Sequence, residues 1–270
     1  MLSKSGVRFQ ILTKAKLTLQ QMAAIIAADL QKLRHDPYEL FTRMIQPAIW
    51  LLIFGQAMAK ANAIPTHGLP YLDYLAPGVL AQSILFISIF FGIALIWEKD
   101  MGILHKILVT PTPRVVLVVA RAIAAGIRGI SQAILIYILS YFLGIDLRLS
   151  FFALLGMCAQ VMLTAGIFST FSLIVASIVK KRERFMGIGQ ALTMPLFFAS
   201  NALYPIDIMP AWIRTLSMVN PLTYQVDAMR CLMIVGEASL FGLLYDFSIG
   251  VAVFALLVAI ATPLYPKILY

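Results

Sequence analysis

Few residues in this sequence have the types and spacing that chemistry requires. The three histidines, His35, His67 and His105, are scattered without metal-ligand spacing. No Gly-Lys dipeptide occurs, so the phosphate-binding loop of many ATPases is missing, and Gly-x-Ser-x-Gly is also absent. Cys158 lies in an apolar run and Cys231 in a segment predicted to be external, so we expect neither a disulfide nor a metal site. The sequence therefore predicts a protein that is not an enzyme and binds no cofactor itself.

Three arginines are spaced regularly along one predicted membrane helix. Arg114, Arg121 and Arg128 recur every seven residues, on nearly one helix face. At 1.5 Å rise per residue, Arg128 lies about 21 Å beyond Arg114. A charge at that depth of a membrane helix indicates either a functional position, with a buried partner such as Glu98, or a side chain that extends back to lipid phosphate. The sequence leaves both interpretations open.

The composition indicates the kind of fold that must position these residues. Of 270 residues, 61% are hydrophobic and 12% charged, and the mean hydropathy is +0.91. A soluble domain carries about twice that charged fraction. The sequence therefore predicts an all-α integral membrane protein, with no separate soluble domain.

The net charge of +9 is unevenly distributed. Of 21 Lys/Arg residues, 17 fall on segments assigned to the inner side, leaving Lys60, Arg148, Arg214 and Arg230 outside. This asymmetry indicates a basic cytoplasmic face next to anionic lipid, not a nucleic-acid surface. We expect a multi-pass protein of the inner (plasma) membrane with both termini cytoplasmic.

Apolar runs predict six membrane spans in a single transmembrane unit, 37–270. Before it, residues 1–36 are predicted to form a cytoplasmic segment whose amphipathic helix, about 15–35, lies in the membrane interface or packs on a partner. The predicted spans are about 38–59, 76–97, 120–143, 151–178, 185–203 and 246–265.

The 40 residues after the fifth span are too apolar for a free loop. Pro210 to Val219 is predicted to form one short helix, and Asn220-Pro221 to cap and open another. Within the second, Asp227 and Arg230 are three residues apart and are expected to pair. Both helices are too short to span, so we expect them to re-enter the outer leaflet, shielded by the bundle.

Residues 98–114 form the most informative loop. Asp100 is positioned to cap a helix whose Ile103, Ile107 and Leu108 share an apolar face, and Gly102 allows another backbone to approach closely. On periodicity alone, this is either a helix that transmits force from a partner or an ordinary helix lying on the membrane.

A family resemblance favours the first interpretation. The run Trp97-Glu98-Lys99-Asp100-Met101-Gly102, the opening Leu75-Ala76-Pro77-Gly78 and the segment Asn220-Pro221-Leu222-Thr223-Tyr224 resemble type-2 ABC transporter permeases, in their drug-exporting, daunorubicin-resistance-like branch. The resemblance covers the whole chain. It implies that about 98–109 is a coupling helix that docks on an ATP-binding subunit, which carries the ATP and Mg. The coupling residues are then Glu98, Asp100, Gly102, Ile103, Leu104, Ile107 and Leu108.

The resemblance also implies a dimer, with a second copy or a paralogous permease, in which the second and fifth spans line the dimer interface where the substrate passes. Side chains expected on that path are Gln82, Ser83, Phe86, Phe90, Gln190, Thr193, Phe197 and Asn201, although helix packing explains such residues equally well. The implied function is ATP-driven export of an amphipathic drug- or lipid-like substrate by alternating access. The alternatives are export of a lipid-linked polysaccharide or glycolipid and, from other classes, an ion-coupled carrier, a channel or a membrane-embedded enzyme.

Overall fold

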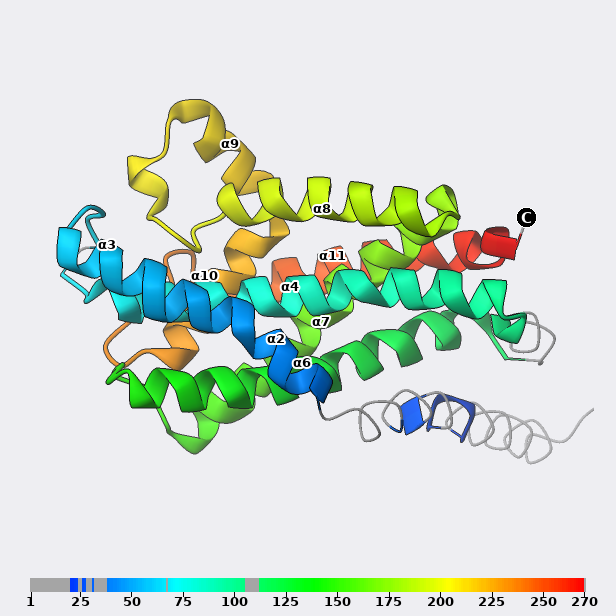
Figure 1. Ribbon diagram of the computed structural model, residues 1–270, viewed down its shortest axis with the longest axis horizontal. Coiled ribbons are helices and arrows are strands. Elements are labelled where there is room, and N and C mark those ends of the chain that lie inside the picture. Colours follow the sequence, from blue (N-terminus) through cyan, green and yellow to red (C-terminus); the bar gives the residue numbers. More distant parts are fainter. Residues whose placement is uncertain are drawn as a thin grey trace, which may run out of the picture.

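Long helices packed side by side make up this protein (Figure 1). The computed structural model describes residues 20–23, 26–27, 31, 38–66, 68–104 and 112–269. Within these residues no strand is present beyond an isolated bridge between Leu147 and Ile234. The expected interfacial helix at 15–35 and the predicted helix start at Asp36-Pro37 lie largely or wholly outside the described residues.

In the part of the chain that the structure describes, four helices are long and apolar enough to cross a membrane: α4 (Tyr71–Asp100), α6 (Arg114–Phe142), α7 (Phe151–Val179) and α11 (Leu243–Leu264), the last continuing through η3 (Tyr265–Leu269). They match the second, third, fourth and sixth predicted spans. The central helices are α4 and α7: the most apolar stretch of α4 is 78% buried, and that of α11 only 11%. The described residues are therefore all-helical, with four apolar helices of membrane-spanning length, as the predicted all-α membrane fold requires.

The first predicted span is helical but interrupted. It consists of α2 (Tyr38–Ile49), the π-helix η1 (Trp50–Gly55) and α3 (Gln56–Ala61). Pro47 lies inside α2 and has no N–H to donate, which weakens the turn just before the π-helix. The chain then leaves α3 through Asn62 in the left-handed conformation.

The fifth predicted span is shorter than expected. Helix α8 (Arg182–Phe198) has 17 residues and contains Pro195 near its end, and the chain turns at residues 199–205 instead of continuing in a helix to 203. At 17 residues, α8 is therefore shorter than each of the four long helices.

The two predicted short helices are present. They are α9 (Ala211–Val219), which follows the short η2 (Ile206–Ile208), and α10 (Pro221–Met233), which Asn220 caps through its side chain. Almost all of α10 is buried, and it packs against α4, α7 and α11. In Figure 1, α9 projects past the end of α8, whereas α10 lies inside the bundle.

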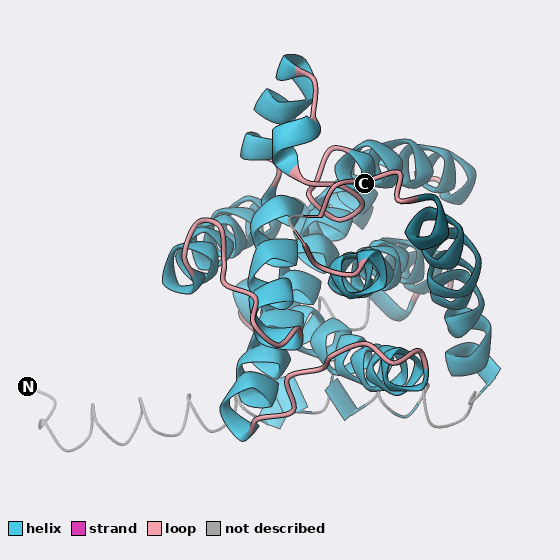
Figure 2. Cartoon of the chain, turned by 90° about the vertical axis from the view of Figure 1, so that its left-hand side faces the viewer, coloured by secondary structure: helices cyan, strands magenta, loops and turns pink. Residues whose placement is uncertain are grey.

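Charged residues divide the bundle into two ends. The basic end carries Lys99, Arg114, Lys180, Lys181 and Lys267 on the α4–α6 and α7–α8 connections and the C-terminus. The opposite end, here called the α10 end, faces the viewer in Figure 2 and gathers the loops after α3, α6, α8 and α10. The segments that the sequence assigns to different sides of the membrane therefore lie at different ends of the molecule.

Candidate functional site

A hollow of about 320 Å³ lies between α2, α4, α6 and α8. A second one, of about 170 Å³, continues along the α4–α8 contact and shares Phe86, Phe90 and Gln190 with the first. The first contains the polar side chains of the hollow together with two phenyl rings, and the second is mostly apolar. Residues that line them include Thr42, Arg43, Gln46 and Gln132 in the first and Phe185 and Met186 in the second.

The structure brings five of the predicted path residues to this hollow. Ser83, Phe86 and Phe90 line it from α4, and Gln190 and Thr193 line it from α8. Residues one turn apart share a helix face, which is why this subset occurs together.

The other three predicted path residues lie elsewhere. Gln82 is buried on a different face of α4, because neighbouring helix positions point about 100° apart. Phe197 is fully buried and its ring stacks edge-on against Trp50, with centroids 5.6 Å apart. Asn201 lies in the turn after α8, also fully buried. None of them lines either part of the hollow.

Polar side chains from α2 and α6 complete the lining, and the sequence did not predict them. Thr42, Arg43 and Gln46 come from α2 and Gln132 from α6. The available signal was weak: Arg43 and Gln46 are three residues apart in a predicted span, and Gln132 follows Arg128 by one turn. Gln132 is fully buried, its Nε2 lies 3.6 Å from Met44 Sδ, and among the described residues its Oε1 has no hydrogen-bond partner.

Arg128 is half-buried on α6, with its guanidinium carbon 5.1 Å from the centre of the Phe91 ring on α4. The predicted partnership with Glu98 is wrong, because Glu98 pairs with Arg121 instead. Arg121 Nη1 donates to Glu98 Oε1 at 3.3 Å and Nη2 donates to Oε2, with both side chains buried. Arg121 is two turns closer than Arg128 to the basic end, level with the last turn of α4.

The predicted coupling segment does not begin with a new helix at Asp100. Helix α4 continues to Asp100, so Glu98 and Asp100 belong to its last turn and Asp100 does not start a new helix. Gly102 follows with φ +71°, a conformation that glycine adopts readily at a helix C-terminus, and among the described residues, its two chain neighbours aside, none lies within 4 Å of the place a Cβ would take. Ile103 is exposed and Leu104 is buried, while Ile107 and Leu108 lie outside the described residues.

At the α10 end, buried side chains satisfy the carbonyl groups where α8 stops. The last four carbonyls of a helix have no partner within it, and apolar surroundings supply none. Asn220 Nδ2 donates to Leu196 O at 2.6 Å and to Ala199 O at 3.0 Å, while its Oδ1 accepts from Leu222 N at 3.0 Å. One amide therefore ends α8 and starts α10.

Three further side chains hold the turn after α8. Tyr74 Oη and Arg230 Nη2 both donate to Asn201 O, at 2.9 and 2.7 Å, and Tyr71 Oη donates to Leu203 O at 3.0 Å. The Arg230 guanidinium also stacks on the Tyr74 ring, 3.8 Å from its centre. We call Tyr71, Tyr74, Asn220 and Arg230 the carbonyl clamp.

A tyrosine and a glycine close the same turn. The Tyr204 hydroxyl donates to Phe198 O at 2.7 Å. Gly78 of α4 meets the turn directly: a Cβ there would lie 2.8 Å from Ala202 Cα and closer still to its carbonyl oxygen.

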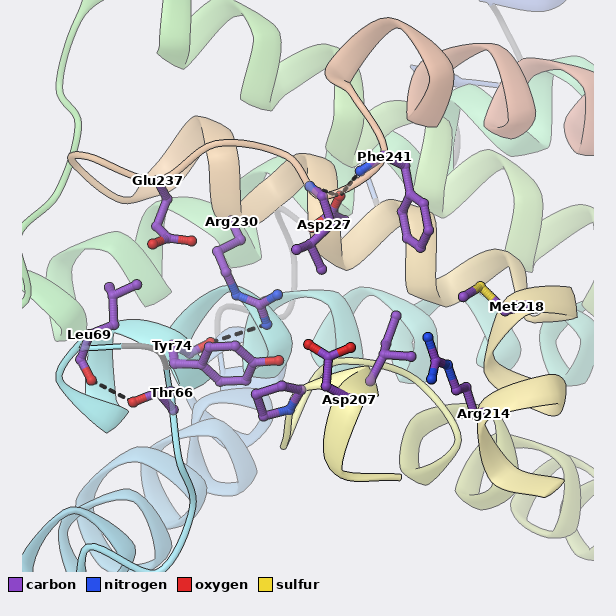
Figure 3. A pocket seen from close by; sticks show the side chains of 13 residues that line it. Thr66, Leu69, Tyr74, Asp207, Arg214, Met218, Asp227, Arg230, Glu237 and Phe241 are labelled. Atoms are coloured by element: carbon purple, nitrogen blue, oxygen red, sulfur yellow. Dashed lines mark hydrogen bonds between the residues drawn. The ribbon is translucent and has the colours of Figure 1, made fainter. Parts of the chain in front are cut away.

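The predicted pair between Asp227 and Arg230 is also wrong. Asp227 Oδ2 accepts from Ser239 Oγ at 2.9 Å and from the N–H groups of Leu240 at 2.7 Å and Phe241 at 3.3 Å. Figure 3 shows the two side chains diverging, with Asp227 toward Phe241 and Arg230 toward Tyr74. Each is used to attach α10 to a different segment, and a pocket of about 220 Å³ lies between them.

Four long apolar helices, a hollow lined by polar and apolar side chains, and basic residues at one end are the features of a multi-pass membrane protein. The chain matches the family described as ABC-2 type transporter over residues 20–234, and it belongs to that family. It is thus a membrane permease subunit of the ABC transporter class, and the resemblance inferred from the sequence is confirmed.

Several proteins similar in sequence are named as transport permeases. A transport permease, ycf38, of Cyanophora paradoxa is 30% identical over 222 residues, which cover 79% of this chain and 74% of that protein. The daunorubicin resistance ABC transporter permease protein DrrB1 of Streptomyces coeruleorubidus is 24% identical, over 86% of this chain and 79% of its own length. The inner membrane transport permease YadH of Escherichia coli K12 is 23% identical, over 69% and 72%.

Proposed function

We propose that this chain is the membrane subunit of an exporter that moves an amphipathic, drug- or lipid-like molecule out of the cytoplasm or inner leaflet. The observation that carries the proposal is the two-part hollow between α4 and α8. Its polar part, with Arg43, Gln46 and Gln132, suits a head group, and its apolar part, with Phe185 and Met186, suits a hydrocarbon or aromatic body. One of the relatives is named for drug resistance, which agrees with this class of substrate.

The proposal assigns the basic end to the cytoplasm. Helix α8 and the interrupted helix α2–η1–α3 then cross the membrane with the four long helices, giving six spans and cytoplasmic termini in the inner membrane. At 17 residues, α8 is about 25 Å long, slightly less than the hydrocarbon core, and the buried turn at 199–205 makes up the difference. Helices α9 and α10 re-enter from the outer side.

An ATP-binding subunit with bound ATP and Mg is proposed to supply the energy. It would dock at the coupling segment, where Met101 and Ile103 are exposed at the end of α4. A second permease chain, identical or paralogous, would complete the transporter. Closure of the two ATPase subunits would then switch the hollow from inward to outward access.

Co-purification tests this assignment. The tagged chain, extracted in mild detergent with its neighbouring complex, should carry an ATP-binding protein whose hydrolysis is sensitive to vanadate. The purified permease alone should hydrolyse no ATP, because it has no Gly-Lys phosphate loop. An isolated chain that turns over ATP, or a native complex without any ATP-binding protein, would refute the assignment.

A second candidate substrate class is favoured by the chemistry of the lining. Among the described residues of the polar part none is a carboxylate, whereas Gln46, Gln132 and Gln190 supply amides beside the Phe86 and Phe90 rings. Amides that both donate and accept suit a head group rich in hydroxyls, and the free Gln132 Oε1 needs a donor. A glycolipid or lipid-linked glycan fits this set, whereas a cationic drug would gain no counter-charge from these residues.

Substrate-stimulated hydrolysis distinguishes the two classes. In nanodiscs that hold the complete complex, a short-chain glycolipid should raise ATP turnover if the second candidate is correct, and a cationic amphipath of equal chain length should raise it if the first is. Gln132→Leu keeps the side-chain volume and removes the amide, so it should weaken the response to the glycolipid by roughly tenfold while sparing that to the cation.

A further inference from the structure

An ion pair joins the last turn of α4 to the first turn of α8. Asp100 Oδ2 accepts from Arg182 Nε at 3.1 Å and from Arg182 Nη2 at 2.8 Å. The same guanidinium stacks on the Trp97 indole, 4.1 Å from the ring. Arg182 thus makes both of its described side-chain contacts with α4, at the point where α4 leads into the coupling segment.

The next turn of α8 is seated against α4 by shape. Phe185 is buried, and its ring occupies the space beside Gly92, where a Cβ would lie within 2.5 Å of it. From this point α8 runs along α4, and Phe185, Met186, Gly189, Gln190 and Thr193 line the apolar part of the hollow. The position of the first turn of α8 relative to α4 therefore sets the width of that part.

The other ion pair at the end of α4 has the opposite character. Glu98 and Arg121 are buried and paired through both oxygens and both terminal nitrogens, which fixes α4 to α6. The Asp100 and Arg182 side chains are 41% and 34% exposed, and an exposed pair is worth under about 1 kcal/mol. Such a pair breaks and re-forms easily, so of the two it is the one able to follow a movement.

We propose that Arg182 is a positioning residue for transport: it carries displacement of the coupling segment from Asp100 to α8 and so changes the width of the hollow. This inference rests on the proposed function, since it needs an ATPase that acts at the basic end. In this arrangement the α4–α6 contact stays fixed through Glu98 and Arg121, and α8 moves relative to α4. The connection after α7 permits the movement, because Lys180 is left-handed and Lys181 extended, which separates α8 from the rigid end of α7.

A distance measurement across the hollow tests the inference. Spin labels at Ile93→Cys on α4 and Met186→Cys on α8, with Cys158 and Cys231 replaced by serine, report the separation of the two helices by pulsed electron resonance. The sample is the complete complex with its ATPase in nanodiscs, with and without ATP and vanadate. The spin-labelled complex that retains Arg182 should show a nucleotide-dependent shift in the distance distribution.

Arg182→Gln and Asp100→Asn should each abolish that shift while the ATPase remains bound and continues to hydrolyse ATP. The exchanged pair, Arg182→Asp with Asp100→Arg, should restore at least half of it, which loss of folding would not allow. Arg184→Gln, which removes an exposed charge from the same turn of α8, is the matched control and should leave the shift unchanged.

Three results would overturn the inference: a full shift in Arg182→Gln, no restoration by the exchanged pair, or no shift in the parent complex although the ATPase is bound. Loss of the ATPase from the parent complex itself would instead refute the proposed function. The two failures are therefore distinguishable in one preparation.

Discussion

Helices α4 and α8 are joined at both ends of the bundle, by different means. At the α10 end the contacts are buried, and the carbonyl clamp donates to backbone oxygens of the turn after α8. At the basic end the contact is a partly exposed ion pair with a stacked indole. A helix that ends away from water must have its carbonyls satisfied permanently, whereas one that ends near water does not. The same two helices are therefore fixed at one end and adjustable at the other.

The largest effect is expected for a buried group at the basic end. Glu98→Gln leaves Arg121 buried without its charge partner, which should lower the free energy of unfolding in detergent by about 3–5 kcal/mol. A loss of this size would show that burial of the contact, and not the end of the bundle at which it lies, determines how much it stabilises the protein.

The control is the double variant Glu98→Leu with Arg121→Leu, which removes both charges and should recover most of the loss. Equal instability in the single and double variants would mean that the pair itself is not what the bundle depends on.

Breaking the clamp at the α10 end should have the next largest effect. Asn220→Ala deprives two buried carbonyls of their donor and removes the cap of α10, at an expected cost of about 2–4 kcal/mol. Asn220→Ser keeps a capping oxygen but cannot donate to Leu196 and Ala199. Thermal denaturation should place it between alanine and the parent, and a serine variant as stable as the parent would show that only the cap matters.

A smaller loss is expected at the close approach of α4 to the turn after α8. Gly78→Ala places a methyl group against the Ala202 backbone, which cannot rotate away, and should cost about 1–3 kcal/mol. Gly187→Ala is the matched control, since it makes the same change in α8 where nothing lies within 4 Å. It should be neutral or stabilising by up to about 1 kcal/mol. Similar melting temperatures for both would contradict the tight contact.

The smallest effect on stability is expected at the adjustable contact. Arg182→Ala should change the free energy of unfolding by less than about 1 kcal/mol, because both partners are partly exposed. The difference from the parent should shrink further in 1 M salt, which screens charges beyond about 3 Å. Unfolding measured at low and high salt checks both statements, and a loss as large as that of Asn220→Ala would remove the contrast between the two ends.

Much of the fold followed from the sequence. The long apolar runs predicted α4, α6, α7 and α11, because a helix that crosses lipid needs about 20 apolar residues whatever it packs against. Asn220 and Pro221 predicted the start of α10, since capping is a local property of a few residues. These features need no knowledge of the partner helices.

The sites were harder to predict because they depend on those partners. Arg121 and Arg128 share a helix face, so spacing alone could not show which of them meets Glu98. Asp227 and Arg230 have the separation of a helical ion pair, yet each has better partners in other segments. Likewise, Thr42, Arg43, Gln46 and Gln132 reach the hollow from α2 and α6, which no local pattern connects to α4.

The π-helix in the first helical segment makes the protein sensitive to deletion of a single residue there. Each hydrogen bond in Trp50–Gly55 closes over five residues instead of four, so the turn holds an additional residue and alters the angular phase between α2 and α3. Upstream of the π-helix, Thr42 and Gln46 face the hollow, and within it the rings of Trp50 and Phe54 meet Phe197 and Tyr71. Deleting Leu52, which is 47% exposed, would return the segment to a regular α-helix and rotate Phe54 relative to Thr42 and Gln46. Substitutions at position 52 would leave the phase intact, so at this point of the chain the number of residues matters more than their identity.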